Sequence, residues 1–167
     1  SQHRACSGQL TAMLIALAGF SGAGKTTAIA YLTSMGFGEP YYAGSIVHAE
    51  LSRRQLAVTP ESERNIRAEL RQTFGMGVFA ERAAPELRRL CVSSPVLLDA
   101  VYCPDELELY KADFGEQLVT VAIEAAFNVR APRVAAREER PIPFEKLRLR
   151  DKFEVTMLRL DEVIAAA

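Results

Sequence analysis

A glycine-rich segment between an apolar run and an amphipathic stretch constrains this sequence more than any other feature. Four residues satisfy the pattern GxxxxGK[ST]: Gly19, Gly24, Lys25 and Thr26. The preceding residues 12–18 are continuously apolar, as in a strand that is covered on both faces of a parallel sheet. Residues 25–34 then have helical spacing and stop before Gly36. The order of strand, loop and helix is the context that this pattern needs in order to bind phosphate.

Such a loop binds phosphate through main-chain amides and two side chains. Glycines let the backbone turn so that successive N–H groups point inward, and the following helix adds its positive N-terminal end. Lys25 would reach the β- and γ-phosphate oxygens of ATP, and the Thr26 hydroxyl would bind Mg²⁺. The predicted nucleotide-binding residues of the loop are Gly19, Ser21, Gly22, Ala23, Gly24, Lys25, Thr26 and Thr27. The alternative is a glycine-rich turn without a ligand, but such a turn has no use for a lysine followed by two threonines.

Composition and charge narrow the class of protein and of partner. The 167 residues are 49% hydrophobic, which is enough for one sizeable core. A formal net charge of -1 excludes a global attraction to nucleic acid or anionic lipid, so any phosphate recognition is local. The longest apolar run is far shorter than the roughly 20 residues of a membrane span. We expect a small-molecule partner, with neither nucleic acid nor membrane, and leave the oligomeric state open.

The three cysteines favour a reducing compartment. Cys6, Cys91 and Cys103 are odd in number and include no CxxC pair, which argues against a zinc site or a disulfide framework. A cytoplasmic protein is therefore expected. Residues 1–11 mix polar residues without periodicity, and we interpret them as a disordered arm or a remnant of expression.

The remaining sequence, 12–167, alternates between strand and helix patterns and is predicted to form one domain. Further strands are expected at 39–43, 95–101 and 118–127, and helices at 25–34, 45–54, 61–73, 78–92 and 104–113. Ser45 is a plausible N-cap of its helix. Residues 129–167 are expected to divide into a basic loop region and one long terminal helix. The pattern predicts an α/β fold with a parallel sheet of four to five strands flanked by helices.

An acid ends the third expected strand. P-loop proteins often hold at this place a carboxylate that binds Mg²⁺ directly or through water, which makes Asp99 a candidate catalytic residue and metal ligand. A helix cap or a surface turn are the alternatives. The sequence alone does not place Asp99 beside Thr26.

Beyond the loop, the chain resembles the nucleoside-monophosphate-kinase-like P-loop kinases, and most closely the archaeal-type dephospho-CoA kinase-like proteins. The segments that carry the resemblance are IALAGFSGAGKTT, AELRQTFGMGVFAERAAPEL, PVLLDAVYCPDELELY, LVTVAIEAAFNVRAPRVAARE and FEKLRLRDKFE. The resemblance implies transfer of the ATP γ-phosphoryl group to an acceptor held by helices within about 45–92. It also implies a basic lid at about 130–143 that closes over both substrates.

The resemblance assigns roles to several cations. Arg133 is expected to bind nucleotide, and Arg137 and Arg140 are expected to act in catalysis, while Arg150 matches a further family arginine. Solvated helix faces are the alternative. The acceptor-binding candidates are Arg71, Arg82 and His48, since bidentate arginines suit a phosphate-bearing acceptor. Surface ion pairs are the alternative for both arginines.

Three departures from the family pattern fall on the acceptor side. The chain has Gly44-Ser45 where an acid usually follows a glycine, His48 where an arginine is common, and Asp99-Ala100-Val101-Tyr102 where Asp-Gly-Ile-Arg is usual. We therefore expect a Mg-ATP-dependent kinase for a small nucleotide-like acceptor, either a nucleoside monophosphate or dephospho-CoA. The alternative is an ATP-binding regulatory module whose acceptor site has decayed. The family pattern also implies a fifth strand after the terminal helix, and the sequence ends at Ala167 before such a strand. We expect that a segment beyond Ala167 supplies it, and a sheet of four strands is the alternative.

Overall fold

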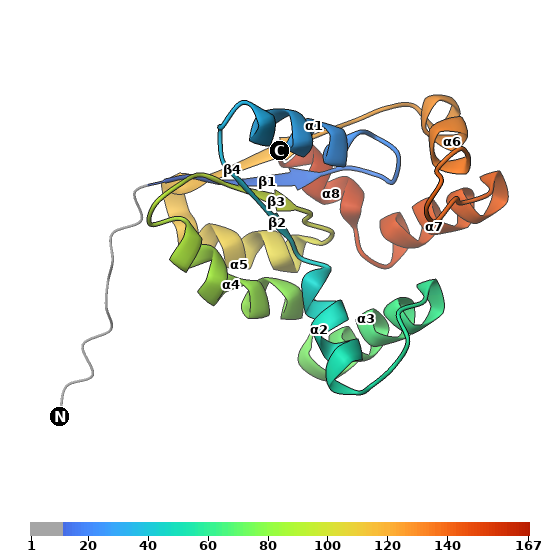
Figure 1. Cartoon of the computed structure of the whole chain (residues 1–167), viewed down its shortest axis with the longest axis horizontal. Helices are drawn as coiled ribbons and strands as arrows, with labels where there is room; N and C mark the ends of the chain where they lie inside the picture. The colour runs from blue at the N-terminus through green and yellow to red at the C-terminus, as the bar shows by residue number, and fades with distance from the viewer. Residues whose placement is uncertain (1–11) are drawn as a thin grey trace.

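A four-stranded parallel sheet forms the centre of the computed structural model, which describes residues 12–167 (Figure 1). The strands are β1 (Leu14–Ala18), β2 (Glu39–Tyr42), β3 (Val96–Asp99) and β4 (Leu118–Ala122), in the order β2-β3-β1-β4. All three pairings are parallel, so the four carboxyl ends lie at one edge of the sheet. The predicted α/β fold is confirmed. The arm predicted for residues 1–11 lies outside the described residues.

Helices cover both faces of the sheet (Figure 1). One face is covered by α1 (Lys25–Ser34), and the other by α4 (Val78–Leu90), α5 (Pro104–Phe114) and α8 (Leu160–Ala165). Successive residues of β1 point to opposite faces, so Ile15 and Leu17 meet Ile29 of α1, while Leu14 packs in the cluster with α4, α5 and α8. Burial on both faces explains why the strand is apolar throughout.

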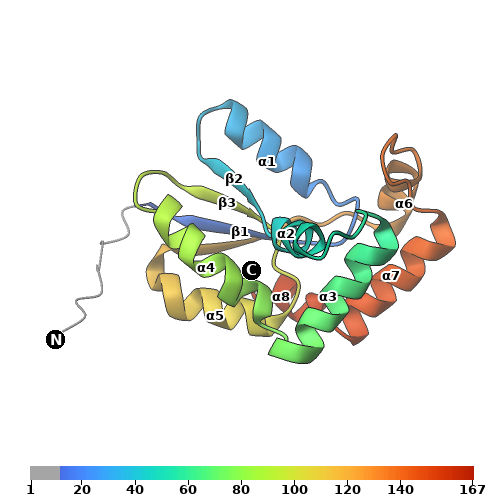
Figure 2. The ribbon, with the colours of Figure 1, turned by 60° about the horizontal axis from the view of Figure 1, so that its bottom comes forward.

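A helical lobe is inserted between β2 and β3. It consists of α2 (Ser45–Arg53), α3 (Pro60–Phe74) and the start of α4, and has its own apolar cluster: Val47, Leu51, Ile66, Leu70, Val78 and Phe79. Thr59 caps α3, because its hydroxyl accepts from the Ser62 amide and the Ser62 hydroxyl accepts from the Thr59 amide. In Figure 2 this lobe lies beyond the carboxyl ends of the strands.

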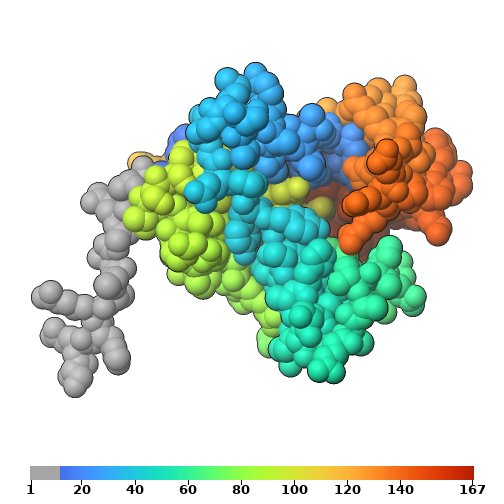
Figure 3. Space-filling view, in the orientation of Figure 1, coloured from blue at the N-terminus to red at the C-terminus, as the bar shows by residue number. Residues whose placement is uncertain are grey.

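Two helices after β4 form the opposite side of the same end. They are α6 (Phe127–Ala135) and α7 (Phe144–Thr156), joined by residues 136–143, and they pack through Ala131, Val134 and Leu147. Phe127 and Phe144 add an edge-to-face contact with centroids 4.9 Å apart. Figure 3 shows a hollow between these helices and the lobe of α2 and α3.

Three predicted local features are wrong. Ser45 is the first residue of α2 rather than its cap: Gly44 occupies the N-cap position, and the Ser45 side chain instead hydrogen-bonds Tyr41. The fourth strand ends at Ala122, because Phe127 already begins α6 and packs against α7. The expected basic loop and single long helix at 129–167 are also wrong, because α6 occupies the first part of the expected loop and the terminal helix is divided into α7 and α8.

The break between α7 and α8 has a packing reason. Arg159 adopts a left-handed conformation with φ 59°, which turns the chain back beneath the sheet. After this turn Leu160 and Val163 are fully buried in the cluster that contains Leu14 and Leu98. A straight continuation of α7 would leave that face of the sheet uncovered, so burial of apolar side chains decides the break.

Two other sequence features can be checked in the described part of the chain. Cys91 and Cys103 are buried free thiols, and Cys6 lies outside the described residues. Across residues 12–167, every helix is too short or too polar to cross a bilayer.

The packing predicts how strongly single core positions contribute to stability. Leu98 of β3 is 0% exposed, so Leu98→Ala is expected to lower the free energy of unfolding by about 2 to 5 kcal/mol. The matched control is Val119→Ala on β4, where the side chain is 38% exposed and the loss should stay under about 1 kcal/mol. Urea denaturation measures both variants, and equal losses would contradict the assignment of the core.

Candidate active site

The loop between β1 and α1 has a backbone that favours glycine at three positions. Gly19 has φ 145°, Gly22 has φ 83° and Gly24 has φ 114°, all in the region that L side chains rarely adopt. A Cβ atom at Gly19 would overlap the Ile123 carbonyl oxygen, and one at Gly22 would overlap the Val134 side chain. The loop is therefore held tightly between the end of β4 and α6. The helix that follows presents its N-terminal amides to whatever the loop encloses.

Lys25 is buried inside this loop. Its Nζ atom donates hydrogen bonds to the carbonyl oxygens of Gly19, at 2.5 Å, and Phe20, at 3.3 Å. Burial lowers the pKa of the Lys25 ammonium, while the nearby carboxylates of Asp99 and Glu154 oppose that shift. The ammonium is thus a concentrated positive charge at the centre of the loop, as binding of phosphate oxygens requires.

Asp99 and Thr26 line one cavity. This cavity has a volume of about 410 Å³ and is lined by Thr26, Ile29, Pro40, Tyr41, Tyr42 and Asp99. The two predicted metal ligands therefore lie at the same cavity, a placement that the sequence alone did not give. Burial raises the pKa of the Asp99 carboxyl, and Lys25 opposes this. A hydroxyl and a carboxylate are the oxygen donors that Mg²⁺ uses together with substrate phosphates, so the pair fits this ion. The described residues contain no group of three or more His, Cys, Asp or Glu side chains that would hold a metal alone.

Arg150 and Glu154 of α7 extend the site. The Arg150 Nε atom donates to Glu154 Oε1 at 2.8 Å, and Glu154 is 3% exposed. The second carboxylate oxygen, Oε2, is buried and has no hydrogen-bond partner. Arg150 and Arg137 both act to lower the pKa of the Lys25 ammonium, so both are near enough to interact with it electrostatically. Tyr102 is near enough to Arg150 and Glu154 for both to act on its pKa, which burial raises to about 12.

A buried arginine that the sequence analysis did not single out ties α6 to the loop. Arg130 is 5% exposed, and its guanidinium donates to the carbonyl oxygens of Ser21, at 3.0 Å, and Ala125, at 2.9 Å. It also pairs with both carboxylate oxygens of Asp151, at 2.6 and 3.3 Å. The Phe20 ring lies 5.1 Å from the guanidinium carbon. Arg130 thereby fixes the loop to both α6 and α7. The sequence offered several arginines in this segment and no signal that distinguishes the buried one.

A second unpredicted residue, Glu63, is contacted by side chains from three segments. Its carboxylate lies 3.0 Å from His48 Nε2 of α2, 3.1 Å from Arg67 of α3 and 2.8 Å from Arg140 of the connection between α6 and α7. Burial acts to raise the pKa of Glu63, but the hydrogen bonds from His48 and Arg140 outweigh it and lower the pKa. The ion pair between Arg140 and Glu63 therefore links the helical lobe to residues 136–143, which join α6 to α7.

Arg71, Arg82 and Arg133 are the remaining predicted residues. Arg71 pairs with buried Glu106 at 3.1 Å and lies over the Phe79 ring at 4.9 Å. Arg82 is exposed and lies 4.9 Å from the centroid of the Phe74 ring. Arg133, in the last turn of α6, is exposed. Their proposed roles stay predictions.

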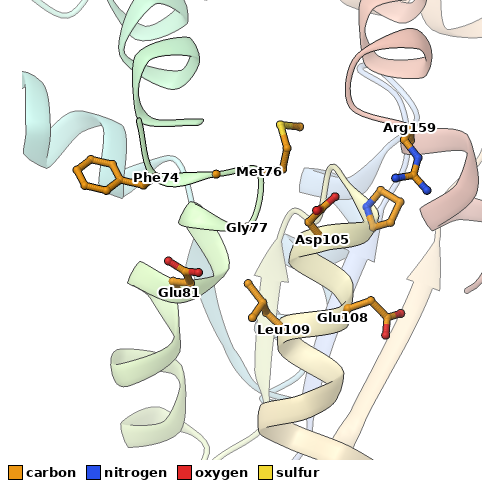
Figure 4. A pocket seen from close by; sticks show the side chains of 10 residues that line it. Phe74, Met76, Gly77, Glu81, Asp105, Glu108, Leu109 and Arg159 are labelled. Carbon is orange, nitrogen blue, oxygen red and sulfur yellow. The ribbon is translucent and has the colours of Figure 1, made fainter. Parts of the chain in front are cut away.

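A second cavity lies on the other face of the sheet, where α3, α4 and α5 meet. Figure 4 shows Phe74, Met76, Asp105 and Arg159 around it. Its volume is about 630 Å³, and three carboxylates of Glu81, Asp105 and Glu108 line it. Its lining includes no residue of the phosphate-binding loop.

Comparison with known proteins identifies the family. The chain is 33% identical over 157 residues to a UPF0200 protein of Hyperthermus butylicus, and the match covers 93% of this chain and 82% of that relative. The chain belongs to the UPF0200 family. It is also 33% identical over 144 residues to a UPF0200/UPF0201 protein of Archaeoglobus fulgidus, but it spans only 44% of that relative's length. No model of a protein family matches the sequence.

A solved structure confirms the fold class. The chain is similar to a gluconokinase from Sinorhizobium meliloti with a TM-score of 0.54, over 93% of this chain and 89% of the other, at 12% sequence identity. The fold is therefore that of the P-loop kinases. None of these three names mentions dephospho-CoA kinase, so the closer resemblance expected from the sequence stays a prediction.

The buried pair between Arg130 and Asp151 predicts a large effect of breaking it. Asp151→Ala leaves the guanidinium buried without its carboxylate, and we expect a loss of about 3 to 5 kcal/mol in unfolding free energy. The control is Asp113→Ala, which breaks a largely exposed pair with Arg88 and should cost under about 1 kcal/mol. Thermal and urea unfolding measure both. Similar small losses would show that the pair does not hold α6 and α7 to the loop.

Proposed function

We propose that this protein is a Mg-ATP-dependent phosphotransferase that moves the γ-phosphoryl group to a small nucleotide-like acceptor, such as a nucleoside monophosphate or dephospho-CoA. One observation carries the proposal. The loop between β1 and α1 encloses the buried Lys25 ammonium, and the carboxylate of Asp99 lies close enough to act on its pKa. The kinase fold of the S. meliloti gluconokinase supports this proposal.

The loop residues account for the binding of the triphosphate tail. The first amides of α1 have no acceptor within the helix and would donate to the β- and γ-phosphate oxygens, together with amides of the loop. Lys25 can exchange its two carbonyl acceptors for phosphate oxygens, which are charged and therefore bind it more strongly. Arg130 holds the Ser21 carbonyl and so keeps the loop in the shape that this exchange requires.

Thr26 and Asp99 are the residues that would hold Mg²⁺. When bound, the ion neutralises the charge that develops between the β- and γ-phosphates. Asp99 is partly buried at the end of β3, and this burial raises the pKa of its carboxyl while Lys25 opposes the shift.

The arginines of α6, α7 and their connection account for the lid. Arg137 and Arg150 are near enough to Lys25 to act on its pKa, and in this proposal they would stabilise the charge that spreads over the transferred phosphoryl group. Arg140 is held by Glu63 of the helical lobe, so the connection reaches across the hollow of Figure 3. Arg133 is exposed on α6 and would bind the nucleotide when the lid closes.

The experiment that tests this function measures ADP release from Mg-ATP in the presence of nucleoside monophosphates or dephospho-CoA. A kinase releases ADP in an amount that depends on one acceptor. The alternative, an ATP-binding regulatory module, binds nucleotide without acceptor-stimulated turnover. It has one observation in its favour, because Arg71 and His48 are already engaged by Glu106 and Glu63. Absence of ATP binding would contradict both.

Lys25→Ala is expected to lower ATP turnover by about a hundredfold or more, because it removes the charge inside the loop. The fold should persist, as far-ultraviolet circular dichroism can verify. Lys111→Ala on the exposed side of α5 is the matched control and should keep full turnover. Unchanged turnover in Lys25→Ala would remove this residue from the mechanism.

Asp99→Asn is expected to lower the Mg²⁺-dependent rate by about a hundredfold, while the dissociation constant for ADP stays within a factor of about three. The reason is that the carboxylate acts on the metal and the reaction rather than on the nucleotide. A Mg²⁺ titration of turnover, with exposed Asp161→Asn as the control, measures this difference. A titration curve identical to that of the unaltered protein would contradict the role of Asp99.

A further inference from the structure

One face of α7 is joined to the phosphate-binding loop. Arg130 links the two, because its guanidinium donates to the Ser21 carbonyl oxygen at 3.0 Å and to an Asp151 carboxylate oxygen at 2.6 Å. In Figure 1 the loop after β1 extends towards α6 and α7. Residues three and four positions apart lie on the same side of a helix, so Glu154 shares this face with Asp151 and with Arg150. The face therefore carries a further guanidinium and a further carboxylate towards the loop.

Glu154 is a buried carboxylate on this face. It is 3% exposed, and its Oε1 atom accepts a hydrogen bond from Arg150 Nε at 2.8 Å. Its Oε2 atom is buried and has no hydrogen-bond partner among the described residues. A carboxylate on the solvent side of a helix keeps its hydration, and an ion pair along the helix then contributes little. Glu154 has lost most of that hydration, so its contact with Arg150 is more than a surface ion pair.

The Arg150 guanidinium is held at one of its three nitrogens. Its Nε atom donates to Glu154, whereas its two terminal nitrogens make no hydrogen bond with any residue in 12–167. The Arg150 side chain is 41% exposed, so these nitrogens are accessible to a ligand. The terminal nitrogens of a guanidinium form a planar fork that matches two oxygens of a phosphate group. The bond to Glu154 thus fixes the plane of the guanidinium and leaves this fork free.

The pair of Arg150 and Glu154 also acts on Lys25. Arg150 acts to lower the pKa of the Lys25 ammonium and Glu154 acts to raise it, so both groups are near enough to interact with it electrostatically. Two cations near each other repel, and a carboxylate beside them offsets that repulsion. Glu154 can therefore keep the Arg150 guanidinium close to Lys25 until phosphate oxygens supply the compensating negative charge.

We infer that Glu154 is a positioning residue, which orients the Arg150 guanidinium so that its two terminal nitrogens bind the γ-phosphate of the nucleotide. The inference rests on the proposed function and deepens it, since Arg150 there stabilises the transferred phosphoryl group. Glu154 acts through Arg150 and does not itself bind phosphate, because two anions repel each other.

The test is calorimetric titration of the full chain with Mg-ADP and with the Mg²⁺ complex of adenylyl imidodiphosphate, an ATP analogue. The ratio of the two dissociation constants isolates the γ-phosphate and requires no acceptor. Glu154→Ala removes the group that holds Arg150 Nε, so the preference for the triphosphate analogue should fall by about tenfold. The affinity for Mg-ADP should stay within a factor of about three, because Mg-ADP has no γ-phosphate.

The matched control is Glu162→Ala, which removes the partner of Arg159 from an exposed ion pair on α8 and should leave the ratio unchanged. An equal fall in Glu162→Ala and Glu154→Ala would contradict the inference. Urea denaturation shows whether each variant is folded. A role of Glu154 in stability alone would lower the free energy of unfolding and leave the ratio unchanged, which would also overturn the inference.

Two conservative variants separate the position of Glu154 from its charge. Glu154→Gln keeps an oxygen that accepts from Arg150 Nε, so the preference for the triphosphate analogue should be kept or increased. Glu154→Asp keeps the charge but withdraws the carboxylate by one methylene group, so this preference should fall. If Glu154→Ala does not fold, these two variants still decide. Equal changes in both would reject a positioning role.

A double variant tests whether Glu154 acts through Arg150. Arg150→Ala alone should reduce the preference for the triphosphate analogue, and the addition of Glu154→Ala should reduce it no further. A further fall in the double variant would overturn the inference. If the unaltered chain binds neither nucleotide, the proposed function fails and the inference fails with it. Nucleotide binding with an unchanged ratio in Glu154→Ala would reject the inference alone.

Discussion

The structure depends on one sharp turn of backbone around a buried positive charge. The chain leaves β1 at Gly19, encloses the Lys25 ammonium with its own carbonyl oxygens and enters α1. This arrangement is stable only because glycines permit the conformation and because neighbouring segments hold it. An ammonium removed from water must be compensated, and Asp99 and Glu154 compensate it from two different elements. The sheet, α6 and α7 are therefore all organised around the same few atoms.

Arg130 and Glu63 show how the parts beyond the sheet are joined to that turn. Arg130 joins the loop to α6 and α7. Glu63 of α3 joins α2 to residues 136–143, the segment between α6 and α7. Both are buried groups that carry several charge-assisted hydrogen bonds, which are stronger than neutral ones. The lobe and the α6–α7 pair are thus held by electrostatics at their contact with the site, while each keeps a small apolar cluster of its own.

The sequence predicted the elements whose cause is local. The strand at 12–18, the loop and the helix from Lys25 follow from apolar runs and glycine positions, and the structure confirms them. The break at Arg159 was missed because its cause is the burial of Leu160 and Val163 against strands far away in the sequence. Arg130 and Glu63 were missed for a similar reason, since only the fold determines which of many charged residues is buried. The sequence named Asp99 and Thr26 separately, and the parallel sheet brings them to one cavity.

The most direct test of the central claim is hydrogen–deuterium exchange of the backbone amides, measured with and without Mg-ADP. If the loop holds a phosphate tail, bound nucleotide must slow exchange at the amides from Gly19 to Thr27, because they then donate to phosphate oxygens. Protection should extend to Arg130, whose guanidinium holds the Ser21 carbonyl. Unchanged exchange across the loop at saturating Mg-ADP, or protection confined to the cavity of Figure 4, would contradict the account.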